Sequence, residues 1–151
     1  MKIIKYKAWD SIRSKWCDEA TIMSDGNWTV FHCDTEEQIC SWDKDSNRIE
    51  FVLFSGLKDK KRTEEYPKGQ EMYGGDIIKT HFGGEDLVGV IKYADKWAKF
   101  YFAAKNRNGV GIAFDPESVF YWYYGEDDED STSIAEVIGN RFEHAHLLEQ
   151  Q

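Results

Sequence analysis

Two histidines near the end of the chain have a spacing that suggests metal chemistry. His144 and His146 lie two positions apart beside Glu143 and Glu149, and two imidazoles with a carboxylate can bind zinc or nickel. In a helix, residues two apart point to different sides, so these histidines converge only in an extended segment. We therefore interpret them as surface residues and predict no bound metal.

The three cysteines offer a second kind of chemistry, nucleophilic attack by a thiolate. Cys17, Cys33 and Cys40 are an odd number, at spacings that fit neither a disulfide framework nor a zinc knuckle. His32 is a candidate base for such a thiol, but its neighbour Cys33 would point to the opposite face of a strand. We expect reduced thiols that are buried or half-buried and have no catalytic role.

Familiar catalytic motifs are missing from the sequence, which has no nucleophile elbow, no phosphate loop and no His-Glu-x-x-His. Tyr73-Gly74-Gly75-Asp76 lacks the lysine and the helix of a phosphate site, so it predicts a turn with a glycine at positive φ. We expect no enzymatic activity, no catalytic residue and no cofactor. A small hydrolase is an alternative, and it would need a cleft that brings together His32, His81, Asp76 or Glu85.

Aromatic residues are the strongest remaining signal. Five follow one another, and they are Phe120, Tyr121, Trp122, Tyr123 and Tyr124. No single strand or helix can bury all five in one core, so some face a groove or a partner. Trp97 and Tyr101, which share one face of an earlier predicted strand, join them as candidate binding residues. Packing of these rings against the first half of the chain is the other interpretation.

The charge balance is acidic, because 28 acidic and 19 basic side chains give a net charge of −9. Such a surface repels phosphate backbones, which disfavours direct nucleic-acid binding, and we interpret the basic run at 58–62 as a solvated loop. The acidic run from Glu126 to Asp130 lacks the alternating ligands of a calcium loop. It supports an alternative function, in which the acidic surface mimics nucleic acid and inhibits a host DNA-binding protein.

The hydropathy pattern contains no membrane segment. No stretch approaches the roughly 18 apolar residues that a membrane span needs. The first residues, Met1 to Ile4, lead into Lys5 and Tyr6 without a secretory apolar region. We expect a cytoplasmic protein with no membrane partner.

Alternating apolar residues predict that short strands position all these side chains. In the first half the expected strands are Ile4–Ala8, Lys15–Met23, Trp28–Cys33, Gln38–Trp42 and Ile49–Phe54. In the second half they are Asp76–Phe82, Leu87–Tyr93, Ala98–Ala104, Val110–Phe114 and Ala135–Ile138. The dipeptide Asn108-Gly109 predicts a hairpin turn, Ser118–Tyr124 fits a helix or a strand, and Arg141–Glu149 predicts a terminal helix or helical turn.

A polar stretch from Leu57 to Tyr73, with Pro67 and Gly69 near its middle, indicates a boundary or a long exposed loop. We therefore divide the chain into an N-terminal β lobe at residues 1–62 and a second lobe at residues 63–151, together forming one compact unit. Short strands joined by tight turns favour a small barrel or roll in the second lobe. The expected fold class is mainly β.

Three segments resemble the YopX family of bacteriophage and prophage proteins. Tyr6–Asp10 resembles the family's R-A-W-D opening, and Phe54–Lys60 with Met72–Lys79 is similar to its TGLKDKNGKEIYEGDIV stretch. Near the end, Glu136–Glu143 resembles EVIGNIYEN. The sequence departs from the family in extra residues around 62–70, in Gly74 where glutamate is usual, and in a His-Ala-His before the last leucines.

The resemblance implies a YopX-like fold with a small SH3-like barrel in the C-terminal part and a short C-terminal helix. It also implies a phage or prophage origin and the cytoplasm of a bacterial host. The family carries no established activity, so no functional residue is transferred from it. The expected function is a non-catalytic protein-interaction module that self-associates as a homo-oligomer and binds an unknown host or phage protein.

Overall fold

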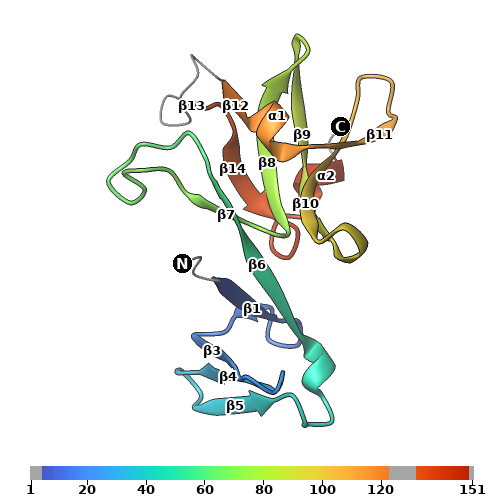
Figure 1. Cartoon of the computed structure of the whole chain (residues 1–151). Coiled ribbons are helices and arrows are strands. Elements are labelled where there is room, and N and C mark those ends of the chain that lie inside the picture. Colours follow the sequence, from blue (N-terminus) through green and yellow to red (C-terminus); the bar gives the residue numbers. More distant parts are fainter. Residues whose placement is uncertain (1–4, 123–131, 150–151) are drawn as a thin grey trace. The chain divides into compact units, whose positions relative to one another are not determined.

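The computed structural model describes residues 5–122 and 132–149, with Trp122 and Thr132 described by their backbones alone (Figure 1). The fold is mainly β, and the strands are β1 (Tyr6–Asp10), β2 (Lys15–Trp16), β3 (Glu19–Ile22), β4 (Trp28–His32), β5 (Glu37–Cys40), β6 (Ile49–Lys58), β7 (Glu71–Tyr73), β8 (Asp76–Phe82), β9 (Glu85–Ala94), β10 (Lys99–Lys105), β11 (Gly111–Phe114), β12 (Tyr121–Trp122), β13 (Thr132–Ser133) and β14 (Glu136–Asn140). Short helical segments are η1 (Ser46–Arg48), η2 (Asp95–Trp97), α1 (Pro116–Phe120) and α2 (His146–Glu149). Within the described ranges, no helix has the length and apolar character that crossing a membrane requires.

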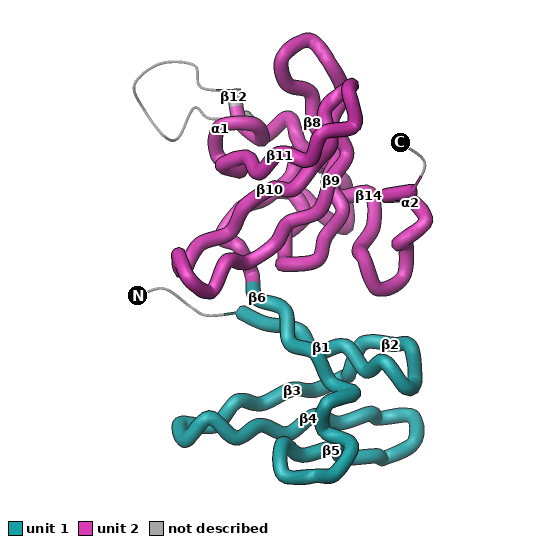
Figure 2. The backbone as a smooth tube through the Cα atoms, turned by 90° about the vertical axis from the view of Figure 1, so that its right-hand side faces the viewer, with its two compact units in different colours: residues 1–53 teal, residues 54–151 magenta. Residues whose placement is uncertain are grey.

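The chain forms two compact units, residues 1–53 and residues 54–151 (Figure 2). The division falls inside β6, whose first half pairs with β1 and whose second half pairs with β7. The boundary expected from the sequence, after residue 62 in the polar stretch, falls within the second of these units. That stretch is bonded into the second unit, because Ser55 Oγ donates to the Met72 carbonyl at 2.7 Å and Asp59 N donates to the Gln70 carbonyl at 3.0 Å.

The first unit contains an antiparallel sheet of β3, β4 and β5, together with the β1–β2 and β1–β6 pairs. In β4, Val30 and His32 point to the same side because alternate residues of a strand share a face, and both are buried. A small apolar core surrounds Val30, and its other buried members are Ala8, Ile39 and Ile49. His32 is thus a histidine held inside the unit.

The second unit contains a five-stranded antiparallel sheet in the order β11-β10-β9-β8-β14. Alternating residues of these strands build one core with α1 and β7, and its buried members are Met72, Ile78, Leu87, Ile91, Phe102, Ala104, Val119, Phe120, Ala135 and Val137. Thr80 Oγ1 donates to the Val119 carbonyl at 2.7 Å, which fixes α1 against β8.

A close approach between β9 and β10 requires glycine at position 89. A Cβ atom at Gly89 would lie 2.2 Å from the carbonyl oxygen of Ala103 on the paired strand. Backbone atoms cannot give way as a flexible side chain can. The two strands can therefore approach this closely only because position 89 carries no side chain.

The helices α1 and α2 lie in two segments for which the sequence allowed more than one structure. Where a helix or a strand was expected, the structure has both, since α1 ends at Phe120 and β12 begins at Tyr121. Asp115 caps α1 by accepting a hydrogen bond from Glu117 N at 3.2 Å, and Pro116 occupies its first turn. In the terminal segment, where a helix or a helical turn was expected, α2 covers His146–Glu149.

Candidate binding face on the second unit

The two edge strands of the five-stranded sheet, β14 and β11, differ in whether other parts of the chain cover them. The β14 edge is covered, because Val137 N donates to Asp59 Oδ2 at 3.1 Å and the Val137 carbonyl accepts from Lys61 Nζ at 2.6 Å. Lys60 N also donates to the Ala135 carbonyl at 2.8 Å. A loop from the 58–62 run thus satisfies the backbone groups of this edge, as proteins commonly do to prevent unwanted strand pairing.

The β11 edge is open. It pairs with β10 on one side, and among the described strands none pairs with its other side. Gly111, Ile112 and Ala113 are exposed, and Val110 just before the strand is 57% exposed. An exposed edge with apolar side chains is a template for an added strand.

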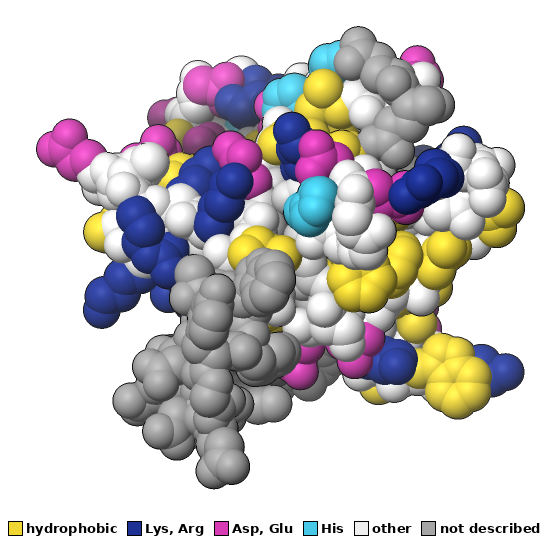
Figure 3. Space-filling model, turned by 90° about the horizontal axis from the view of Figure 1, so that it is seen from above, with side chains coloured by type: hydrophobic (Ala, Val, Ile, Leu, Met, Phe, Trp, Pro, Cys, Tyr) yellow, Lys and Arg dark blue, Asp and Glu magenta, His cyan; other side chains and the backbone are white. Residues whose placement is uncertain are grey.

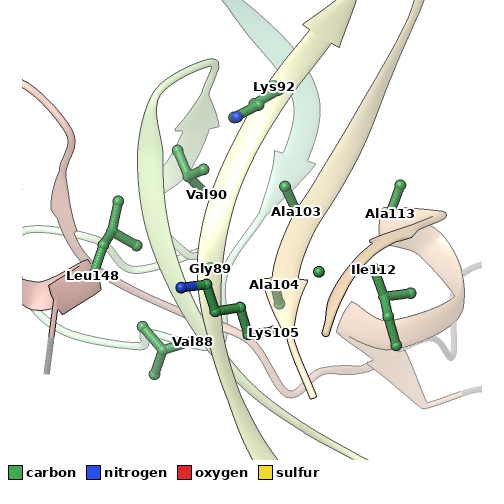
Figure 4. A pocket seen from close by; sticks show the side chains of 11 residues that line it. Val88, Gly89, Val90, Lys92, Ala103, Ala104, Lys105, Ile112, Ala113 and Leu148 are labelled. Carbon is green, nitrogen blue, oxygen red and sulfur yellow. The ribbon is translucent and has the colours of Figure 1, made fainter. Parts of the chain in front are cut away.

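A hollow of about 480 Å³ lies beside this edge (Figure 4). Small and apolar side chains of β9, β10 and β11 form most of it, with Leu148 of α2 at one side, and its residues are Val88, Gly89, Val90, Lys92, Ala103, Ala104, Lys105, Gly111, Ile112, Ala113 and Leu148. The short side chains of Ala103 and Ala113 leave part of this space open. The hollow can therefore take small apolar side chains from a neighbouring strand.

The charges at this hollow are all positive. Lys92 and Lys105 are exposed, and no acidic residue lines the hollow. Neither lysine makes an ion pair with any residue in the described part of the chain. In a protein with a net charge of −9, two unpaired lysines at an apolar hollow favour an acidic ligand.

A second hollow of about 480 Å³ contains two of the aromatic residues selected from the sequence. Trp97 and Tyr101 line it, with Trp97 68% exposed and Tyr101 half-buried. Ala113 lines both hollows, so β11 borders the two together. We name the surface formed by the two hollows and β11 the β11 face.

Charge is mixed over the face of the molecule that is drawn in Figure 3. Figure 3 shows basic and acidic side chains distributed over one view of the molecule, with smaller groups of hydrophobic side chains between them. The β11 face differs because its first hollow combines apolar walls with lysines alone.

A comparison of the sequence with models of protein families identifies the family to which the chain belongs. A family model described as YopX protein matches residues 5–149, nearly the whole chain. The chain belongs to the YopX family. The resemblance drawn from the three sequence motifs is thereby confirmed.

One solved structure similar to this YopX-family chain is the X-ray crystal structure of protein yopX from Bacillus subtilis. The two sequences are 20% identical, and the match covers 95% of this chain and 96% of that chain with a TM-score of 0.48. No curated protein matches the chain significantly.

The aromatic run does not form one surface. Phe120 is fully buried, and its ring lies 4.9 Å from that of Phe102 between centroids. The Tyr121 hydroxyl donates to the Lys58 carbonyl and accepts from Lys58 N, both at 3.1 Å, so this half-buried ring is tied to β6. Trp122 lies in β12, and Tyr123 and Tyr124, like the acidic run 126–130, lie outside the described residues.

The structure brings His32 next to Cys17 and not to Cys33. Cys17 Sγ lies 3.9 Å from His32 Nε2, and the same nitrogen lies 2.8 Å from Asp10 Oδ2. A catalytic triad needs the base to contact its two partners through different nitrogens. Burial raises the pKa of the Cys17 thiol to about 11, which opposes nucleophilic use. Cys33 is exposed, so the expectation that all three thiols are buried or half-buried was wrong.

The other residues considered for hydrolysis or metal binding have separate structural roles. Asp76 accepts a hydrogen bond from Tyr73 N at 2.8 Å. Gly75 has a φ of +89°, as the turn prediction expected. His81 pairs with Asp86, and Glu85 pairs with Arg107. His144 Nδ1 accepts from Asn140 N at 3.1 Å and its ring packs on Gly139.

Sequence reasoning missed Lys92, Lys105 and Ala113 in the β11 face. These residues are single positions in three strands, and only strand register brings Ala113 opposite Ala103. The available signal was the concentration of small residues at Ala103-Ala104 and Gly109 to Ala113 within strand-like sequence.

Proposed function

We propose that this YopX-family chain is a non-catalytic protein-interaction module whose β11 face binds an extended segment of a partner protein. The observation that carries the proposal is the open β11 edge beside an apolar hollow with two unpaired lysines. Backbone groups of the edge supply hydrogen bonds to an added strand, and the hollow supplies side-chain selectivity. The bound segment carries acidic residues alternating with small apolar ones, and its source is a host or phage protein.

The same edge supports self-association, the second part of the proposal. Two copies of β11 running antiparallel would form a symmetric contact that covers Val110 and Ile112, which are 57% and 36% exposed. Self-association and binding of a partner segment therefore compete for one edge.

An NMR titration with a short probe peptide of alternating Val and Asp tests partner binding. We expect the amide signals of Gly111–Phe114 to shift more than those of β14, because the loop at 58–62 covers the β14 edge. A peptide of alternating Val and Lys should bind far more weakly, since Lys92 and Lys105 would repel it. Equal binding of the two peptides, or shifts centred on another strand, would contradict the proposal.

Matched variants separate the β11 face from the rest of the sheet. Ala113→Glu adds a long acidic side chain at an exposed position of both hollows, and Lys105→Glu reverses one of the lysines. Both should abolish the shifts. Lys79→Glu makes the same charge reversal at an exposed position on β8 and should leave them unchanged. Light scattering tests self-association, and a monomer at high concentration would remove that part of the proposal.

The finer fold and origin expectations belong to the same proposal. The antiparallel β11-β10-β9-β8-β14 sheet, with the register shift in β14, supports an SH3-like barrel in the second unit. Family membership supports a phage or prophage origin and the cytoplasm of a bacterial host as the site of action.

A further inference from the structure

His32 has one ring nitrogen in a strong hydrogen bond and the other without any partner. Nε2 lies 2.8 Å from Asp10 Oδ2, and neither side chain is reached by solvent. Nδ1 is buried and has no hydrogen-bond partner. A buried polar atom without a partner costs roughly 1 to 3 kcal/mol, so its retention calls for an explanation.

The Asp10 contact determines which nitrogen can bind a ligand. Burial by itself raises the pKa of the Asp10 carboxyl, but hydrogen bonds from Arg48 and His32 outweigh it and hold that pKa well below its usual range. The Asp10 carboxylate is therefore an acceptor, and His32 donates to it through Nε2–H. In the neutral ring this leaves the lone pair on Nδ1, an arrangement typical of metal-binding histidines, which donate their other N–H to a carboxylate.

Two carboxylates stand close to this histidine at the surface of the first unit. Asp18 and Asp34 are both exposed, and ligand atoms of Asp18, His32 and Asp34 all lie within 4.8 Å of one another. Asp18 Oδ2 accepts from Cys33 N at 2.8 Å, and Asp34 Oδ2 accepts from Arg13 and Lys15. Each carboxylate therefore keeps its Oδ1 atom for another bond.

A second group, Asp10 with His32 and Glu37, has comparable spacing but already contains a cation. Arg48 Nη2 donates to Asp10 Oδ2 at 2.7 Å and to Glu37 Oε1 at 3.2 Å. A metal ion at that place would have to displace a buried guanidinium. Asp18 and Asp34 make no such buried ion pair, so the surface side of His32 is the favoured position.

We propose that His32 Nδ1, Asp18 and Asp34 form a site for a divalent first-row transition metal of the zinc type, with Asp10 orienting the imidazole. One imidazole and two carboxylates suit zinc, and water can complete the coordination. Rotation of the two exposed aspartates closes the group to metal–ligand distances of about 2.0 to 2.2 Å. The ion ties the β2–β3 connection to the segment that follows β4.

Calorimetry with zinc chloride on the full chain, in reducing buffer, tests the site. We expect one binding event that Asp18→Asn and Asp34→Asn each weaken by roughly tenfold or more, as expected for lost metal ligands. Both aspartates are exposed, so these variants keep the fold. Glu19→Gln removes the same charge beside Asp18 and should change affinity less than about twofold.

The chemical shifts of the imidazole nitrogens, measured by NMR, distinguish metal coordination from a general effect of nearby charge. Zinc should shift His32 Nδ1 while Nε2 keeps its proton to Asp10. His146→Ala should leave binding unchanged, because the terminal histidines are not part of the site. The proposal fails if zinc does not bind, if Glu19→Gln weakens binding as much as Asp34→Asn, or if binding depends on His146.

Discussion

Arg48 donates two hydrogen bonds to the Asp10 carboxylate inside the first unit. Arg48 Nε donates to Asp10 Oδ1 at 2.9 Å and Nη2 donates to Oδ2 at 2.7 Å. The Asp10 side chain is inaccessible to solvent and that of Arg48 is 7% exposed. A carboxylate buried in this way is tolerated only while its cationic partner stays in place.

Arg48→Met should therefore destabilise the first unit by about 3 to 5 kcal/mol, since it leaves the Asp10 charge buried and uncompensated. Urea denaturation at neutral pH measures the change. Arg107→Met, which breaks the surface pair with Glu85, should cost no more than about 1 kcal/mol. A similar decrease of the unfolding free energy in both variants would mean that the buried ion pair stabilises the protein no more than the surface pair does.

The Asp59 carboxyl should make stability depend on pH. Burial by itself raises its pKa, but hydrogen bonds from the backbone N–H groups of Gln70, Val137 and Lys61 outweigh burial and lower it. A folded-state pKa below the unfolded value means that the stabilisation is complete above the unfolded value of about 3.9 and is lost as pH falls through the lower folded value. The stability gap between the native chain and Asp59→Asn should thus be largest near pH 7 and shrink below about pH 4, as urea midpoints across this range would show. A gap that stays constant with pH would contradict this account.

Gly89→Ala should destabilise the second unit by about 1 to 3 kcal/mol or more, because the added Cβ meets the Ala103 carbonyl oxygen at 2.2 Å. Gly111→Ala is the matched control on the same sheet, since a Cβ there has nothing within 4 Å. Thermal melting of the two variants measures the difference. Equal melting temperatures would show that β9 and β10 separate easily at this point.

Substitution of Phe120 should mainly reduce stability and substitution of Trp97 should mainly reduce binding, although both were selected as aromatic binding candidates. Phe120→Ala should cost about 3 to 5 kcal/mol, because the ring is fully buried against Phe102. Trp97→Ala should change stability by less than about 0.5 kcal/mol, as its ring is 68% exposed, and should weaken binding at the β11 face. Chemical denaturation and the peptide titration measure the two effects. A large stability loss in Trp97→Ala would remove this residue from the candidate binding surface.

Local patterns predicted much of the second unit. The alternation between Asp76 and Phe82 gave the bounds of β8, since Ile78 and Thr80 are buried while Lys79 and His81 are exposed. The Asn108-Gly109 turn was also expected, and Gly109 has a φ of +78°. These features depend on residues that are neighbours in the chain, which is why sequence alone identifies them.

Long-range pairings explain what the sequence left out. Arg48 lies 38 positions from Asp10, so no local motif links the two, and the His32 environment depends on that pairing. The strand expected at Ile49–Phe54 continues to Lys58, into the polar stretch that was expected to be a boundary or a loop. This extension is a strand because β7, more than ten residues later, supplies its partner.

The continuity of β6 across both units has a consequence for how the chain opens. Residues 49–53 of this strand are protected by β1, whereas Phe54 and Lys58 are protected by β7. Amide protons along one strand therefore report on two cooperative blocks, and their exchange with deuterium should show a step between Leu53 and Phe54 if the blocks open at different free energies. The exchange rates along β6 thus report, residue by residue, the opening free energy of each of the two units.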